Sequence, residues 1–304
     1  MNESNLKERF SSHVVDLQSK IIEEMKKYDS SLTIKKDNWE RKDTDGNPGG
    51  GGVTCAITGK VFENAGVNTS VVFGKMDPLF GAKILRESNT ENSSKDYHMW
   101  ATGISLILHP KNPRVPTVHA NFRMIQVNEH FWFGGGADLT PYYPHEEDFK
   151  HFHQTWKDVC GIDYLSMKET CDKYFVNTHR DNEMRGVGGI FFDHFNSGSL
   201  EQDLEKVIQL SHSFIPSYFP LVKKRAEEPY TDEDEEFQLH RRGRYVEFNL
   251  LHDRGTTFGL KTNGRTDSIL ISLPGRCKFT YSYRPREGSV HEEMMQNYFP
   301  KSWV

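Results

Sequence analysis

The sequence predicts an α+β fold, in which a large sheet of mainly antiparallel strands carries helices on its faces. Strand-like segments are grouped and mostly joined by short turns, which favours antiparallel pairing. Amphipathic helical patterns precede and follow these groups. The 304 residues contain no Pro/Gly/Ser-rich linker or low-complexity tract, so we expect a single domain over residues 1–304.

The chain begins with a predicted amphipathic helix, because apolar residues recur there at three- and four-residue spacing, a stripe suited to packing on a sheet. These residues are Leu6, Phe10, Val14, Leu17, Ile21 and Met25. Residues 43–52 follow and end in four successive glycines. Their backbone freedom predicts an irregular segment, either a connector or a lid over a ligand.

Strands and helices then alternate in blocks. The first predicted strands are 53–57, 68–73, 103–109, 117–127 and 130–133, with a hairpin turn at Asn128 and Glu129. Helical patterns cover 146–159, 164–176 and 200–225. The last predicted strands are 188–195, 244–251, 268–274 and 278–284.

Composition excludes several classes of protein. The net charge of −5 and pI near 6.3 argue against a nucleic-acid partner. No apolar run approaches the roughly 18 residues of a membrane span, and the polar N-terminus does not resemble a secretory signal, so we expect a cytoplasmic protein. The four cysteines lack CxxC spacing, which predicts reduced thiols. A basic cluster at Arg241, Arg242 and Arg244 fits either a solvated strand entry or anion binding.

Two neighbouring strands carry alternating polar residues that predict a functional surface. Successive side chains of a strand point to opposite faces, so His119, Asn121 and Arg123 share one face while their apolar neighbours share the other. Residues 104–109 repeat the arrangement, with Ser105 and His109 on the polar face. Two such polar rows predict the floor of a site.

Three glycines precede Asp138, which we expect on a loop whose backbone can approach a ligand closely. An Asx turn or a helix cap ahead of Leu139 is the ordinary alternative. The position of Asp138, just after the hairpin that carries His119 and Arg123, favours a functional carboxylate.

A metal site is a second hypothesis, because several histidines lie in or near these segments. They are His109, His119, His153 and His179. Their spacing matches no compact ligand motif, so metal ligation is the less favoured interpretation. The chain also lacks a GxSxG elbow and a GxGxxG turn after a strand, which leaves serine hydrolysis and nicotinamide chemistry unsupported.

Five long segments resemble oxygen-dependent coproporphyrinogen III oxidases. They are HPKNPRVPTVHANFR, WFGGGADLTPYY, HRDNEMRGVGGIFFD, RRGRYVEFNLLHDRGTTFGL and NGRTDSILISLP, and the likeness extends from about Trp39 to Val304. The resemblance implies a homodimer whose subunits each contain a flat antiparallel sheet between helix layers. It also implies the oxidative decarboxylation of two propionates of coproporphyrinogen III to vinyl groups, which yields protoporphyrinogen IX for haem synthesis with O2 as oxidant.

The same resemblance implies roles for particular residues. His119 matches the family's proton donor, and Asp138 matches an aspartate that accepts hydrogen bonds from pyrrole N–H groups. With Arg123 these form the expected catalytic set. The expected substrate contacts are Ser105, Asn121, Phe122, Arg123, Arg185, Asn263, Gly264 and Arg265. We expect no required cofactor; a divalent metal at the four histidines is the alternative, and residues 245–280 match the dimer-forming segment.

Three positions depart from the family pattern: His194 replaces a second aspartate after Asp193, Phe279 replaces a tryptophan, and Asn64 replaces a lysine. The first departure weakens any role for paired carboxylates there.

Arginines suit the four substrate propionates, because a guanidinium binds a carboxylate through two parallel hydrogen bonds. Two other functions stay open: a metal-dependent oxygenase or hydrolase that uses the histidines, and a catalytically silent tetrapyrrole carrier.

Overall fold

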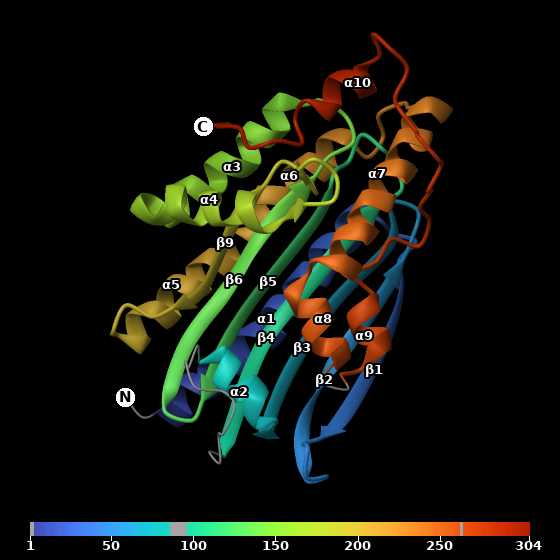
Figure 1. The fold of residues 1–304 in the computed structure, drawn as a ribbon. Helices are drawn as coiled ribbons and strands as arrows, with labels where there is room; N and C mark the ends of the chain where they lie inside the picture. The colour runs from blue at the N-terminus through green and yellow to red at the C-terminus, as the bar shows by residue number, and fades with distance from the viewer. Residues whose placement is uncertain (1–2, 86–95, 262–263) are drawn as a thin grey trace.

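A single seven-stranded sheet forms the centre of the computed structural model, which describes residues 3–85, 96–261 and 264–304 (Figure 1). Its strand order is β1-β2-β3-β4-β5-β6-β9, and every neighbouring pair is antiparallel. The strands are β1 (Thr33–Lys42), β2 (Pro48–Thr58), β3 (Phe62–Met76), β4 (Tyr97–Pro110), β5 (Thr117–Val127), β6 (His130–Thr140) and β9 (Gly189–Phe195). Two short strands, β7 (Val176–Asn177) and β8 (Glu183–Met184), form a separate hairpin. The predicted α+β class is confirmed.

Helices cover both faces of this sheet (Figure 1). One layer contains α1 (Glu3–Tyr28), α3 (Glu146–Cys160), α5 (Leu200–His212) and α6 (Phe214–Arg225). The other face carries α4 (Tyr164–Tyr174), α7 (Asp232–Leu251), α8 (Arg254–Lys261) and α9 (Thr266–Leu270). The short helices α2 (Pro78–Ile84) and α10 (Val290–Met295) complete the described elements, with a 3-10 turn at Gly161–Asp163. No helix in the described ranges is long and apolar enough to cross a membrane.

The main apolar core lies between the first helix layer and one face of the sheet. All six stripe residues of α1 are buried there, as predicted. On β5 the side chains of Val118, Ala120, Phe122 and Met124 are also fully buried on this face. The intervening residues of β5 are only partly buried. The period-two pattern therefore identified the core face of β5 correctly.

Residues 43–47 connect β1 to β2, but the glycine tract at 49–52 is not irregular, so the predicted connector or lid is wrong for this part. The glycines belong to β2; Gly51 and Gly52 pair with both β1 and β3, and Gly50 pairs with β3. A Cβ at Gly52 would lie 2.5 Å from a ring carbon of Trp39, and one at Gly50 would lie 2.1 Å from the Val71 carbonyl oxygen. The glycines make room for neighbouring strands and an indole ring. Tertiary packing therefore outweighs their preference for loops.

The last three strands expected beyond β9 are also wrong. Residues 244–251 form the C-terminal half of α7, 268–270 belong to α9, and 278–284 contain no regular element. The helix α7 begins with a capping box in which Thr231 and Asp234 bond reciprocally to each other's backbone. Helix formation thus starts twelve residues before the strand-like composition of RYVEFNLL and continues through it.

Two smaller expectations changed as well. The predicted helix 200–225 is interrupted at Ser213 into α5 and α6, and Pro216 lies in the first turn of α6, where a missing N–H is tolerated. The basic cluster lies inside α7 and is not a strand entry, and two of its three arginines are buried in ion pairs, with Arg244 partly exposed beside Glu247. Arg241 is buried against Glu183 and the Tyr298 ring, and Arg242 is buried against Glu63.

The contact between α1 and α5 predicts a pH-dependent stability. The His13 ring is partly buried, contacts the His212 ring and bonds to the Ser211 hydroxyl at 2.7 Å. Burial, with His212 and Lys20 nearby, lowers the pKa of His13 to about 4. Below about pH 6.5 the unfolded chain therefore binds this proton more readily, and stability falls as the pH drops towards 4.

We expect His13→Gln to remove about 1 kcal/mol of the acid-induced loss, allowing for solvent screening. Urea unfolding of both proteins at pH 7 and pH 4.5 measures it. An identical loss in both proteins would contradict the assignment to His13.

Candidate active site

The functional residues predicted on β4 and β5 lie on the sheet face opposite the main core. The strand register places Ser105 beside Asn121 and Ile107 beside His119. On the next strand, Asp138 is paired with His119. Ser105 is exposed, and His119, Asn121 and Arg123 are partly buried. These residues are the polar face of the sheet, and hydrogen bonds from Asn68 to Ser268 and from Arg185 to Asn249 connect the same face to α9 and α7.

Asp138 lies inside β6, so the expectation that it follows the strand on a loop is wrong. Its carboxylate accepts a hydrogen bond from His119 Nδ1 at 2.9 Å, and only 1% of the residue is exposed. This bond fixes the imidazole tautomer in which Nε2 is unprotonated when the ring is neutral. Within the described residues Nε2 makes no hydrogen bond, and part of the ring is exposed.

Arg185 neutralises Asp138 within the interior. Its Nη2 donates to Asp138 Oδ1 at 2.7 Å, its Nε donates to Oδ2 at 3.1 Å, and only 2% of the arginine is exposed. Burial opposes ionisation of Asp138, but the Arg185 charge and the His119 hydrogen bond hold the pKa of the carboxyl below its usual value. Both residues predicted to meet substrate directly are therefore engaged with each other beneath the surface.

One face of α7 completes the environment of Arg185, and the sequence analysis missed it. The Asn249 side-chain oxygen accepts from Arg185 Nη1 at 2.7 Å. The guanidinium lies 4.4 Å from the ring centre of Tyr245, 4.9 Å from that of Phe248 and 4.2 Å from that of Phe175. Residues 245, 248, 249 and 252 recur at helical spacing. That periodicity was the available signal, and the strand interpretation of 244–251 concealed it.

A second acidic group missed from the sequence lies at the start of α8. Asp253 accepts hydrogen bonds from the Thr256 N–H at 2.7 Å and from the Tyr174 hydroxyl at 2.8 Å. Burial opposes its ionisation, but these bonds and the nearby Arg185 charge lower its pKa. In the sequence, Asp253 follows the predicted strand 244–251 and precedes Arg254 and Gly255, and no local pattern marked it as a functional residue.

Arg123 reaches from β5 across β6 to β9. Its Nη2 donates to Asp193 Oδ1 at 3.1 Å, and the side chains of the pair are 34% and 22% exposed. The β6 residue between them is Gly134, where a Cβ would lie 2.7 Å from Arg123 Nε. The missing side chain therefore allows the guanidinium to lie flat on the sheet.

Arg265 lies at the opposite end of this face, where it forms an ion pair with Asp37 of β1. Gly264 precedes it and donates its backbone N–H to Gly259. Ser268 of α9 bonds to Thr54 and Asn68, which ties this segment to the sheet. The predicted contact Asn263 lies outside the described residues.

The four metal-ligand candidates do not converge. His109 is buried, donates from Nε2 to the Ser272 carbonyl at 3.0 Å and accepts from Thr117 through Nδ1. His153 is equally buried, and its ring nitrogens bond to the Val187 carbonyl and the Tyr164 hydroxyl. His179 stacks on His252 at the surface. Within residues 3–85, 96–261 and 264–304 no group of three such side chains is arranged to hold a metal ion.

Four further predicted positions occupy different surroundings. Phe122 is buried on the core face, so the prediction that its side chain contacts a substrate on the polar face is wrong. His194 has a φ of +55° and stacks on Trp132. The Asn64 amide binds the Leu273 carbonyl and the Gly275 N–H. Phe279 is 60% exposed, which excludes a core position within this chain.

A family model described as coproporphyrinogen III oxidase matches residues 9–303 of the 304. The chain belongs to the coproporphyrinogen III oxidase family. The match includes every strand and helix near the polar face, so the whole architecture belongs to the family and not a single motif. Membership supports a coproporphyrinogen oxidase role in haem biosynthesis, as the sequence resemblance predicted.

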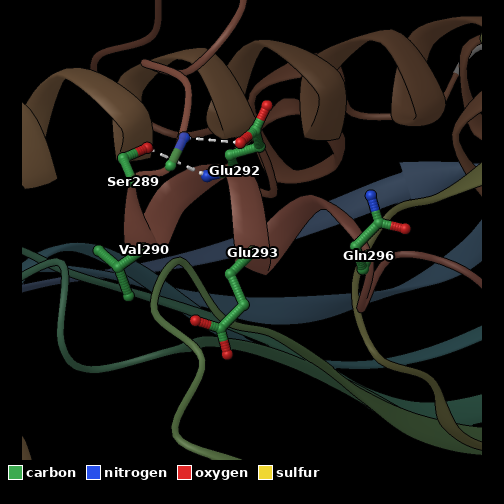
Figure 2. A pocket seen from close by; sticks show the side chains of 6 residues that line it. Ser289, Val290, Glu292, Glu293 and Gln296 are labelled. Atoms are coloured by element: carbon green, nitrogen blue, oxygen red, sulfur yellow. Dashed lines mark hydrogen bonds between the residues drawn. The ribbon is translucent and has the colours of Figure 1, made fainter.

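An open cavity of about 450 Å³ beside α10 does not suit the substrate of this family (Figure 2). Its lining includes Glu292 and Glu293, with Glu292 accepting the Gly288 N–H at 2.8 Å. Coproporphyrinogen bears four carboxylates, which these acidic side chains would repel. The polar face with Arg123 is the better electrostatic match.

The buried pair predicts a large stability effect for Arg185→Met. We expect a loss of about 3–5 kcal/mol in the free energy of unfolding, because Asp138 keeps a buried charge without its partner. The double variant Asp138→Asn/Arg185→Met should recover part of this loss. Urea denaturation of all three proteins measures both effects. A cost below about 1 kcal/mol for Arg185→Met would disprove the pairing.

Proposed function

We propose that this chain catalyses the O2-dependent oxidative decarboxylation of coproporphyrinogen III to protoporphyrinogen IX. At each of two propionates, R–CH2–CH2–COOH and O2 become R–CH=CH2, CO2 and H2O2. The C–C bond to the carboxyl breaks, one hydrogen leaves the carbon next to the ring, and the two electrons pass to O2. The substrate is therefore the reductant and O2 the oxidant.

The observation that carries this proposal is the His119–Asp138 pair on the open polar face. Asp138 fixes the tautomer of His119 by accepting from Nδ1, and Nε2 has no hydrogen-bonding partner in the described chain. An imidazole held in this way can accept a proton at Nε2 and return it. We assign to His119 the proton transfers that accompany CO2 loss and O2 reduction.

Asp138 acts in this scheme through His119 and not by touching the pyrrole ring. The role first expected for it, accepting pyrrole N–H hydrogen bonds, conflicts with its burial and with the two donors already bound to its oxygens. Its Oδ1 keeps accepting the hydrogen bond from Nδ1 when His119 takes a proton at Nε2, which stabilises and orients the imidazolium. Arg185 keeps that carboxylate ionised and correctly placed, which replaces its expected contact with a propionate.

Substrate carboxylates are assigned to the two half-exposed arginines of the face, Arg123 and Arg265. Asp37 of β1 and Asn121 of β5 lie at the same level of the sheet, on the first and last of five neighbouring strands. Four strand-to-strand spacings of about 4.8 Å separate them by about 19 Å. Charges at both ends of so wide a surface suit a large ligand with several acidic arms. Ser105 and Asn121 supply neutral hydrogen-bonding groups between them.

We also propose that catalysis needs no bound metal. His109 and His153 each use both ring nitrogens within the protein, so metal ligation would break buried hydrogen bonds at each residue.

The homodimer, the single domain and the cytoplasmic location stay predictions. Phe279 and Tyr281 support the homodimer, since both are large and exposed in the segment that extends from the predicted interface.

An assay of metal-stripped protein tests this function. Coproporphyrinogen III is supplied anaerobically, O2 is then admitted, and CO2, H2O2 and the porphyrinogen products are measured. We expect protoporphyrinogen IX only after O2 is admitted, with activity unchanged by a chelator. Activity restored only by added metal would support the metal-dependent oxygenase instead. Binding without CO2 release under both conditions would identify a silent carrier.

His119→Asn should lower kcat by about 10²–10⁴, because it removes the group that transfers protons. Binding of coproporphyrin III, measured by fluorescence quenching, should change little, since the arginines are intact. A kcat within threefold of the wild type would exclude His119 as the proton-transfer group.

Asp138→Asn should raise the activation free energy by about 3 kcal/mol or more, with substrate binding largely retained. It should also lower the free energy of unfolding, because the buried Arg185 loses its counter-charge. Turnover of the folded variant and its urea denaturation separate the two effects. Turnover near the wild-type rate would contradict the role of Asp138.

A further inference from the structure

The guanidinium of Arg123 is oriented by groups from three different strands. Nη2 donates to Asp193 Oδ1 of β9 at 3.1 Å, and Nη1 donates to Asn121 Oδ1 of β5 at 3.4 Å. Beneath them lies Gly134 of β6, where a Cβ would be 3.0 Å from Nη2 and from Asp193 Oδ1. Because Gly134 has no side chain, the ion pair between Arg123 and Asp193 can lie directly on the β6 backbone.

Asp193 is itself held in place before any ligand arrives. The register between β6 and β9 shifts between Phe133 and Gly135, close to this residue. The His194 N–H donates to Asp193 Oδ1 at 3.1 Å, and the His194 ring stacks on Trp132 with centres 4.9 Å apart. Burial opposes ionisation of Asp193, but the Arg123 charge lowers the pKa of the carboxyl, which stays ionised.

We propose that Asp193 is a positioning residue that, with Gly134, holds Arg123 ready to bind one substrate carboxylate. The inference rests on the proposed function. A free arginine loses much rotamer entropy when it binds a ligand, and a partner that orders it beforehand removes that cost. The partly exposed guanidinium keeps hydrogen-bonding capacity for an incoming carboxylate, because Nη1 and Nη2 carry four N–H donors and Asn121 and Asp193 use two of them.

Two other roles for Asp193 would give different experimental results. If Asp193 merely occupied the place of the substrate carboxylate, its removal would free Arg123 and strengthen binding. If Asp193 only stabilised the fold, its removal would act equally with or without Arg123. A double-mutant cycle on these two residues therefore separates the three possibilities.

Asp193→Ala should raise KM about tenfold while kcat stays within twofold. Asp193→Asn, which keeps the acceptor oxygen, should stay within about threefold of the wild-type KM. Arg123→Ala should raise KM at least as much as Asp193→Ala, and adding Asp193→Ala to it should change nothing further. Gly134→Ala should also raise KM, because its methyl group displaces the guanidinium. Glu169→Ala, which breaks the exposed pair with Lys173, is the control without effect.

A lower or unchanged KM in Asp193→Ala, or an equal effect in the Arg123→Ala background, overturns the proposal. If Asp193→Ala does not fold, the Gly134→Ala result decides, since that variant keeps both charges. Coproporphyrin III binding, measured by fluorescence quenching in every variant, reports on Asp193 even without turnover. Inactive wild-type protein that shows the binding pattern would refute the proposed function alone.

Discussion

The buried ion pair between Asp138 and Arg185 is the interaction on which the rest of the polar face depends. It joins β6, the strand next to the sheet edge, to the segment after β8, and Asn249 joins the same guanidinium to α7. Because each charge is almost fully buried, neither can lose its partner without a large desolvation cost. The pair therefore fixes the position of α7 over the sheet and, through Asp138, the orientation of His119.

The charged groups of the polar face differ in how deeply they are buried. The fully buried charges of Asp138 and Arg185 neutralise each other, and the partly exposed imidazole of His119, the proposed proton-transfer group, lies beside them. Further out, Arg123 and Arg265 are each paired with one aspartate and remain partly exposed. Such an arrangement suits a large anionic ligand, because the interior stays neutral while the partly exposed arginines keep N–H donors for its carboxylates. The proposed chemistry then requires only acid–base groups and a substrate that supplies the electrons.

Glycine has an architectural role on this surface. Gly52 and Gly134 lie beside Trp39 and Arg123, whose side chains extend across them. Any larger residue would force these side chains upward into the space above the sheet. The polar face is consequently flat where a ligand would lie. This requirement explains why glycine tracts occur within strands here, although their conformational entropy favours loops.

The sequence by itself determined the amphipathic α1, the strand β5 with its two faces, the first four residues of β6 and the family resemblance, because period-two and period-3.6 patterns are local properties. Local reasoning could not place Asp138 inside a strand, assign 244–251 to a helix or identify Asn249. Those outcomes depend on partners far along the chain, such as Arg185 for Asp138. Tertiary structure alone decided which polar residues are buried in pairs and which stay open, since burial and charge pairing are properties of the assembled sheet and helices.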